Sequence, residues 1–289
     1  MSRPEAFASS HYAGRVRIDL HTHSNRSDGT DTPTELVENA KAVGLDIVAL
    51  TDHDTAVGWD EADEAAQRVG IRLVLGMEIS TELAGRSVHL LAYGLDREHA
   101  GLIEELEKVI ESRTGRIPKF IEKFRLLGID VTEDEIRAKV GDADAVGRPH
   151  IADVLVDKGV VATRDEAFDS LLSPGGGLYV GRYSIALPSA VELVKAAGGK
   201  AVLAHPWSRG SHKVLTPEVI AGLVDHGLDG IEVDHADHDT DDRAALRQIV
   251  KENDLIMTGS SDYHGSGKSS DFRLGANTTD PAEFEKLLG

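Results

Sequence analysis

Apolar and polar positions along the first hundred residues change between two periods. Some segments alternate with a period of two, as in a β-strand, and others repeat with the period of an α-helix. The first helix begins with a capping box, Thr32 followed by Glu35, and has Pro33 at its first position. Strands and helices alternate over residues 15–20, 33–43, 47–50, 61–69 and 71–75. This βαβαβ order predicts a parallel sheet or barrel.

A further apolar run, residues 88–93, follows the third strand closely. Only a short turn containing Ala84 and Gly85 separates the two segments. Such a connection is too short for a helical crossover, so we expect these two strands to pair antiparallel.

The pattern then becomes helical throughout. We expect helices over 98–127 (one or two), from Thr132, over 149–158 and from Thr163. Afterwards the strand–helix alternation resumes, with helices over 189–197, 216–227 and 241–252, strands over 201–204, 230–233 and 255–258, and a last helix after Asp280. The chain is therefore predicted to have an α/β barrel domain, 15–97 and 184–289, with a small helical domain, 98–183, inserted over the active-site face.

Composition narrows the class of protein. Of the 289 residues, 40% are hydrophobic and only 4% aromatic, so the core must be mostly aliphatic, which suits a parallel sheet. The absence of cysteine excludes disulfides and thiolate ligands and fits a reducing compartment. Residues 1–14 lack the apolar core of a signal peptide, and no apolar run is long enough to span a membrane. We expect a cytoplasmic monomer.

The formal net charge is −19. Such a surface repels nucleic acid at long range, so we expect no binding to duplex DNA. Anionic substrates remain compatible with it, because bound divalent cations can invert the field inside one cleft.

Histidines and acidic residues follow the predicted strands. His21 and His23 follow the first, His53 the second, Glu78 the third, His205 the strand over 201–204, and Asp262 and His264 the last. In a β/α barrel these ends converge on one face, where active sites are built. His89 begins its strand, but antiparallel pairing places that start beside the end of the third strand, near Glu78.

The spacing of these residues indicates metal ions. Side chains at i and i+2 of an extended segment point the same way, so His21 and His23 can reach one ion, as can Asp262 and His264. Imidazole and carboxylate ligands suit Zn²⁺, Mn²⁺ or Fe²⁺. A carboxylate such as Glu78 can bridge two ions about 4 Å apart, which lower the pKa of a shared water.

Five motifs in order resemble those of the PHP (polymerase and histidinol phosphatase) superfamily. They are Asp-Leu-His-Thr-His-Ser (19–24) with Ser-Asp-Gly (27–29), Leu-Thr-Asp-His-Asp (50–54), Gly-Met-Glu (76–78), Ala-His-Pro (204–206) and Gly-Ser-Ser-Asp-Tyr-His-Gly (259–265). The resemblance implies a distorted (β/α)7 TIM-like barrel with two to three divalent metal ions. By analogy with the family, the first ion is held by His21, His23, Glu78 and Asp262, the second by Asp28, His53 and His264, and the third by Glu78, His89 and His205. Some members have histidine at the position of Asp28.

Gly-Arg-Pro-His (147–150) in the helical segment resembles stand-alone bacterial phosphoesterases of this superfamily. The resemblance implies hydrolysis of phosphate monoesters of nucleotides, of the AMP or nucleoside 3′,5′-bisphosphate type, and also 5′-end trimming of short RNA. A metal-activated hydroxide would attack phosphorus without a protein nucleophile, and the general acid is not assigned. We expect Arg148, His150, His235 and His238 to contact the nucleotide or short oligonucleotide substrate, and Trp207 to stack on a base or to pack.

Three alternatives remain open. Histidinol phosphate is another substrate of the superfamily. Amidohydrolases also use His-x-His on a β/α barrel, but not usually with the Asp28, Glu78 and Asp-x-His combination present here. A module that binds phosphate without catalysis would have lost ligands, and none is lost.

Overall fold

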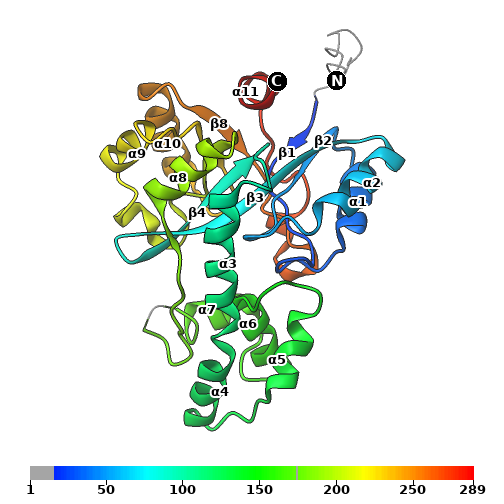
Figure 1. The fold of residues 1–289 in the computed structure, drawn as a ribbon, viewed down its shortest axis with the longest axis vertical. Coiled ribbons are helices and arrows are strands. Elements are labelled where there is room, and N and C mark those ends of the chain that lie inside the picture. Colours follow the sequence, from blue (N-terminus) through cyan, green and yellow to red (C-terminus); the bar gives the residue numbers. More distant parts are fainter. Residues whose placement is uncertain (1–15, 174) are drawn as a thin grey trace.

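Residues 16–173 and 175–289 are described by a computed structural model, in which the strands form one nearly closed, barrel-shaped sheet with helices around it (Figure 1). The strands run in the order β1-β2-β3-β4-β6-β7-β8, and β5 pairs with β3. Their bounds are β1 Ile18–Asp19, β2 Ile47–Leu50, β3 Arg72–Leu83, β4 Arg86–Tyr93, β5 Ile185–Ala186, β6 Lys200–Ala204, β7 Gly230–Asp234 and β8 Ile256–Gly259. The predicted α/β class and distorted barrel are confirmed.

Strand β4 runs against its neighbours. The pairs β1·β2, β2·β3, β6·β7 and β7·β8 are parallel, whereas β4 is antiparallel to both β3 and β6. The hairpin predicted from the short turn is therefore confirmed. A single parallel bridge between Thr22 and Tyr263 links the segments after β1 and β8 and brings the first and last strands together.

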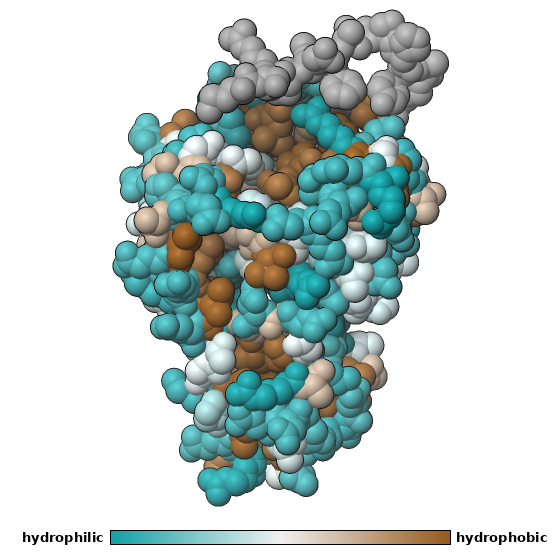
Figure 2. All heavy atoms as spheres, turned by 45° about the vertical axis from the view of Figure 1, so that its right-hand side comes forward, coloured by the Kyte–Doolittle hydropathy of each residue, from teal (hydrophilic) through white to brown (hydrophobic). Residues whose placement is uncertain are grey.

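Six helices surround the barrel, namely α1 Pro33–Ala42, α2 Trp59–Val69, α8 Leu187–Ala196, α9 Pro217–Val224, α10 Thr240–Glu252 and α11 Pro281–Leu288. Thr32 caps α1 as predicted, since its hydroxyl accepts from Glu35 N at 3.1 Å while Glu35 accepts from Thr32 N at 2.9 Å. The face of the molecule shown in Figure 2 is mostly hydrophilic, with smaller apolar patches. In the part of the chain described, no helix has the length and apolarity needed to cross a bilayer.

Five helices between β4 and β5 form most of a separate lobe below the barrel (Figure 1). They are α3 Ala100–Thr114, α4 Ile117–Leu126, α5 Glu133–Val140, α6 Arg148–Asp157 and α7 Arg164–Asp169. The buried face of α3 packs on the barrel through Leu102, Leu106 and Val109, but α4 to α7 enclose their own core around Phe120 and Phe124. The two cores share no buried side chain, so barrel and lobe pack as separate units joined by α3. The domain boundaries at 98 and 183 remain predictions.

Some predicted bounds were wrong. Only Ile18 and Asp19 of the predicted strand 15–20 pair in the sheet, because His21 to Ser24 turn into the site; Arg15, residues 1–14 and Pro174 lie outside the described residues. Strand β3 continues eight residues beyond the predicted end at Leu75, since Gly76 to Leu83 pair with β4. The two-residue β5 was not predicted, because it is too short to show a period.

An ion pair fastens the lobe to the barrel. Arg113 Nη2, on α3, lies 2.5 Å from Asp54 Oδ2 and donates to Ser80 Oγ at 2.6 Å. Asp54 also accepts from Ser80 N at 2.6 Å. Burial raises the pKa of Asp54, but Arg113 and its neighbours lower it by more, so the carboxyl stays ionised. Asp54 follows His53, and the ion pair therefore links the lobe directly to the site.

Replacement of Arg113 by Met leaves Asp54 buried without its counter-charge. We expect the free energy of unfolding in urea to fall by about 3–5 kcal/mol. The double variant Asp54→Asn/Arg113→Met should lose less free energy of unfolding than this single variant, because it leaves no buried charge without a partner. Arg137→Met, which breaks the exposed pair with Glu133, is the control and should cost about 1 kcal/mol or less. A double variant as unstable as the sum of its singles would contradict the ion pair.

Candidate metal centre

The nine side chains predicted to hold metal converge at the ends of the barrel strands. His21, His23 and Asp28 come from the segment after β1, His53 from the segment after β2, His205 from that after β6, and Asp262 and His264 from that after β8. Glu78 lies within β3, and His89 lies on β4 opposite Ser80. The antiparallel turn of β4 therefore brings His89 beside Glu78, as predicted, with 2.7 Å between His89 Nδ1 and Glu78 Oε1.

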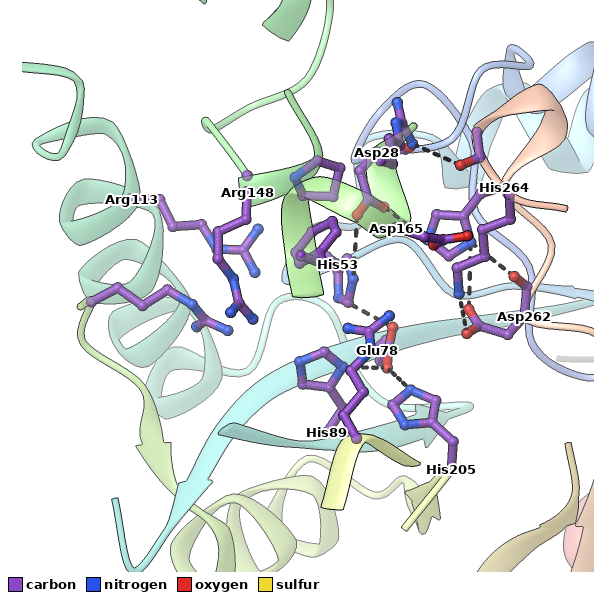
Figure 3. Close-up of a pocket in the computed structure, with 18 of the residues that line it drawn as sticks. Asp28, His53, Glu78, His89, Arg113, Arg148, Asp165, His205, Asp262 and His264 are labelled. Carbon is purple, nitrogen blue, oxygen red and sulfur yellow. Dashed lines mark hydrogen bonds and ion pairs between the residues drawn. The ribbon is translucent and has the colours of Figure 1, made fainter. Parts of the chain in front are cut away.

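The Glu78 carboxylate lies at the centre of this cluster and is 1% exposed. Its Oε1 faces His89 Nδ1 and also His205 Nε2, at 3.0 Å. Its Oε2 faces His21 Nε2 at 3.3 Å, His23 Nε2 at 3.1 Å and His53 Nδ1 at 3.2 Å. Figure 3 shows Glu78 between His53, His89 and His205. Two oxygens that face different histidines are what a bridging ligand requires.

Two imidazoles point their nitrogens at each other beside Glu78. His21 Nε2 and His23 Nε2 are 3.0 Å apart, and each lies 3.5 Å from Asp262 Oδ1. His21 Nδ1 lies 3.1 Å from Glu232 Oε1, which places a proton on Nδ1. Burial opposes the charged ring, but Glu232, Asp262 and Glu78 raise the pKa of His21 by more, so a bound ion would displace the second proton from Nε2. His21, His23, Glu78 and Asp262 thus offer four ligand atoms around one point.

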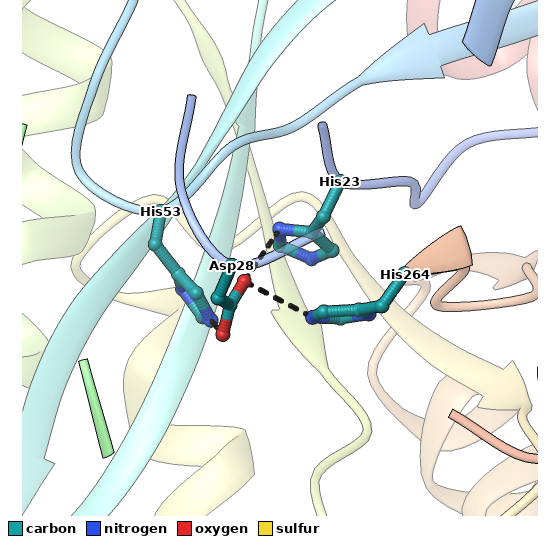
Figure 4. Close-up of side chains that lie close together, drawn as sticks. All are labelled: His23, Asp28, His53 and His264. Atoms are coloured by element: carbon teal, nitrogen blue, oxygen red, sulfur yellow. Dashed lines mark ion pairs between the residues drawn. The ribbon is translucent and has the colours of Figure 1, made fainter. Parts of the chain in front are cut away.

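Asp28 gathers a second group of rings (Figure 4). Its Oδ1 lies 3.2 Å from His264 Nε2 and 3.8 Å from His23 Nδ1, and its Oδ2 lies 3.7 Å from His53 Nε2. His264 Nδ1 donates to the carbonyl of Asp262 at 2.8 Å, which leaves Nε2 free to ligate. A third group joins His53 and His89 to Glu78.

The donor set fits divalent ions. His53 Nδ1 is buried and has no hydrogen-bond partner, because its approach to Glu78 lacks hydrogen-bond geometry. Burial lowers the pKa of His53 to about 3 and, together with Lys268, that of His264 to about 4, so both rings are neutral. Neutral imidazoles and ionised carboxylates are the forms that bind Zn²⁺, Mn²⁺ or Fe²⁺.

Glu232 supports two of the predicted ligands from behind, and sequence reasoning missed it. It is fully buried in β7, and besides His21 it contacts His205, whose backbone N–H donates to Glu232 Oε2 at 2.7 Å. His205 has a φ of 27°, an unfavourable conformation that this hydrogen bond stabilises. The sequence signal for this role was an acidic residue within the apolar run 230–233, a predicted buried strand.

Three histidines predicted to bind substrate are engaged elsewhere. His235 is fully buried; its Nδ1 accepts from Asp237 N, so its Nε2 donates to Asp262 Oδ2 at 3.2 Å. His238 donates to the carbonyl of Val233, and His150 Nδ1 accepts from Gly147 N at 3.0 Å. All three lie behind the cavity wall, where their rings hold the local backbone or a predicted ligand. Their placement does not support substrate contact.

Arg148 lines the cavity, as its predicted role requires. Trp207 instead packs against the barrel core and donates to the carbonyl of Leu215, so it packs rather than stacks on a base. The cavity holds about 100 Å³, and Figure 3 shows Arg113 and Arg148 across it from Asp262 and His264. Its basic side chains are Arg113, Arg116, Arg148, Arg164, Arg182, Arg209 and Lys268. Sequence reasoning missed Arg113, Arg116, Arg164 and Lys268. The cavity wall thus holds seven basic side chains against four acidic ones, an excess of positive charge in an acidic protein.

Comparison with known proteins places this site in a family. The PHP domain family matches residues 19–131. A 5′-3′ exoribonuclease from Haemophilus influenzae is 36% identical over 86% of this chain and 90% of its own length. The chain belongs to the PHP family. The relatives in this family are hydrolytic, metal-dependent phosphoesterases, and this chain is a phosphoesterase of the same kind.

Two further relatives of the PHP chain agree in length and fold. A 3′,5′-nucleoside bisphosphate phosphatase from Chromobacterium violaceum is 34% identical over 88% of this chain and 89% of its own. A solved structure from Bifidobacterium adolescentis, named for an inferred metal-dependent phosphoesterase activity, superposes with a TM-score of 0.88 at 37% identity, over 94% of this chain and 95% of that one. The similarity extends through the helical lobe as well as the barrel.

Replacement of Glu232 by Gln should weaken metal binding. The amide keeps the size of the side chain but removes the charge that orients His21, so we expect affinity to fall by about 10–100-fold. Metal content after dialysis against a buffered Mn²⁺ solution, measured by elemental analysis, tests this. Glu64→Gln, on the exposed face of α2, is the matched control. Unchanged metal content in Glu232→Gln would contradict the role.

Proposed function

We propose that this PHP protein hydrolyses phosphate monoesters of nucleotides, of the AMP or nucleoside 3′,5′-bisphosphate type. The observation that carries the proposal is the joining, in one cavity, of a metal-ligand cluster centred on Glu78 with basic side chains from the lobe. The metal-ligand cluster supports hydrolysis at phosphorus, and the basic side chains support binding of a further anionic group of the substrate. The names of the relatives from Chromobacterium violaceum and Haemophilus influenzae favour nucleotide substrates.

We assign two to three divalent ions, Mn²⁺, Fe²⁺ or Zn²⁺, to the cluster. The first would be held by His21, His23, Glu78 and Asp262, and the second by Asp28, His53 and His264. The third would be held by Glu78, His89 and His205, where Glu78 Oε1 lies 2.7 Å from His89 Nδ1 and 3.0 Å from His205 Nε2. When bound, such ions lower the pKa of a water and neutralise the oxygens of a phosphate.

The protein side chains act by binding and orientation. Arg148 is the first candidate for contact with substrate, because it lines the cavity and a guanidinium matches the geometry of phosphate oxygens. Lys268, also in the wall, contacts Asp262 Oδ2 and adds positive charge beside the first ion. His235 orients Asp262 from behind. No residue is assigned here as the general acid.

Short 5′-phosphorylated RNA is a second candidate substrate. The relative from Haemophilus influenzae that is named a 5′-3′ exoribonuclease aligns with 86% of this chain, and an RNA substrate would be cleaved at a phosphodiester rather than at a phosphate monoester. The monomeric state expected from the sequence remains a prediction.

Phosphate release by the Mn²⁺-loaded protein tests the proposal. We expect release from AMP or adenosine 3′,5′-bisphosphate, loss of activity in EDTA, and recovery on return of Mn²⁺. His23→Ala should abolish activity, because it removes a ligand shared by two of the groups. His226→Ala, on the surface, should retain it. Full activity after chelation would refute the proposal.

The same preparation separates the alternatives. Release of phosphate from histidinol phosphate would indicate that substrate class. Release of nucleotides from a short 5′-phosphorylated RNA would indicate an exoribonuclease. Cleavage of C–N bonds with no phosphate release would instead support an amidohydrolase. A metal content near zero would support a module that only binds phosphate.

A further inference from the structure

Three arginine side chains separate the metal cavity from a second cavity. Arg116, Arg148 and Arg182, here called the arginine layer, line both cavities, and the second holds about 170 Å³. The remaining wall of the second cavity includes the hydroxyl groups of Ser87, Tyr179 and Ser184. A group bound at the arginine layer can therefore extend away from the metal centre into a polar space.

The arginine layer carries charge that no carboxylate pairs directly, because Asp54, which acts on Arg182 from beyond ion-pair distance, is already paired with Arg113. Arg116, 3% exposed, donates only to backbone carbonyls, the shortest at 3.0 Å to Val146. Arg182 donates to Ser184 Oγ at 3.0 Å, and Arg148 reaches only the carbonyl of Leu172, at 3.5 Å. Within residues 16–173 and 175–289, none of the three has a carboxylate at ion-pair distance, whereas their neighbours do: Arg113 pairs with Asp54 and Arg164 with Asp153.

Arg116 is buried and Arg148 and Arg182 are half-buried. Cations in such places that lack a paired carboxylate are costly unless an anion binds them. Burial and the repulsion from neighbouring arginines lower the pKa values of Arg116 and Arg182 to about 9, which still leaves both charged at neutral pH. Glu82, at the edge of the second cavity, is exposed to solvent and does not neutralise them. The anion must therefore come from a ligand.

The three positive charges of the arginine layer indicate how much negative charge a bound anion must carry. A phosphate monoester carries about −1.5 to −2 near neutral pH, so one such group leaves part of the threefold positive charge unmatched. A second, linked phosphate supplies the remaining charge and occupies the second cavity. We propose that the arginine layer binds a diphosphate group of the substrate, at the end that does not react at the metal centre. This proposal rests on the proposed function and specifies its substrate class.

Kinetics with three substrates test the subsite in the Mn²⁺-loaded full chain. They are adenosine 3′-phosphates with a 5′-hydroxyl, a 5′-monophosphate or a 5′-diphosphate, with products separated by anion-exchange chromatography. We expect kcat/KM for release of the 3′-phosphate to rise at each added phosphate.

A variant of the second cavity locates the added phosphate. Gly181 lines only this cavity, and a Cβ added there would have no atom within 4 Å. Gly181→Glu brings a negative charge and should lower the ratio of kcat/KM for the 5′-diphosphate to that for the 5′-monophosphate about tenfold. Gly181→Gln, equal in size but uncharged, should leave that ratio within about twofold of the native value.

The outcomes distinguish the two proposals. Equal kcat/KM for the 5′-diphosphate and 5′-monophosphate substrates would overturn the diphosphate subsite and leave the phosphatase intact. A preference for the 5′-diphosphate that survives in Gly181→Glu would also overturn it, because the added phosphate would then bind elsewhere. Absence of phosphate release from all three substrates would instead contradict the proposed function.

Discussion

A buried carboxylate, Glu78, is the constraint on which the rest of the structure depends. Its two oxygens face five histidine rings at distances of 2.7 to 3.3 Å, and the side chain is almost fully buried at the wall of the cavity. A negative charge in such surroundings is stable only among cations or aligned donors. The barrel satisfies this need by bringing rings from four separate stretches of chain to one point. Divalent ions would add positive charge beside the neutral ring of His53, whose pKa burial lowers to about 3.

The reversed direction of β4 is part of the same solution. In an all-parallel barrel, every strand would contribute ligands from its carboxyl end. Because β4 runs antiparallel to β3 and β6, its amino end reaches this face, and His89 arrives from the start of a strand. His89 on β4 pairs with Ser80 of β3 on one side and with Ala204 of β6 on the other. Glu78, His89 and His205 therefore meet across three adjacent strands. The irregularity of the barrel is therefore a means of building the site.

Much of this arrangement could be predicted from the sequence, because strand ends in a β/α fold converge and because the ordered PHP motifs are specific. His89 could be predicted as well, since the short turn at Ala84 and Gly85 permits only a hairpin. The residues that support the candidate ligands could not be predicted from the sequence. Glu232 and Arg113 act through contacts over long sequence separations, and their neighbours in sequence show no period or motif for such contacts. For His235, a position after a strand does not reveal whether the ring points into the cavity or lies behind Asp262, where it donates to the carboxylate.

The separation of the two hydrophobic cores has a consequence for how such a protein can diversify. All nine candidate ligands belong to barrel segments, whereas five of the seven basic residues of the cavity lie between β4 and β5, in or next to the lobe. Because α4 to α7 pack around their own core, substitutions of Arg148 on α6 and Arg164 on α7 change the charge of the cavity wall without disturbing either core of the barrel. Hydrolysis and selectivity are thus encoded in different stretches of one chain. A common reaction can be kept while its range of esters changes.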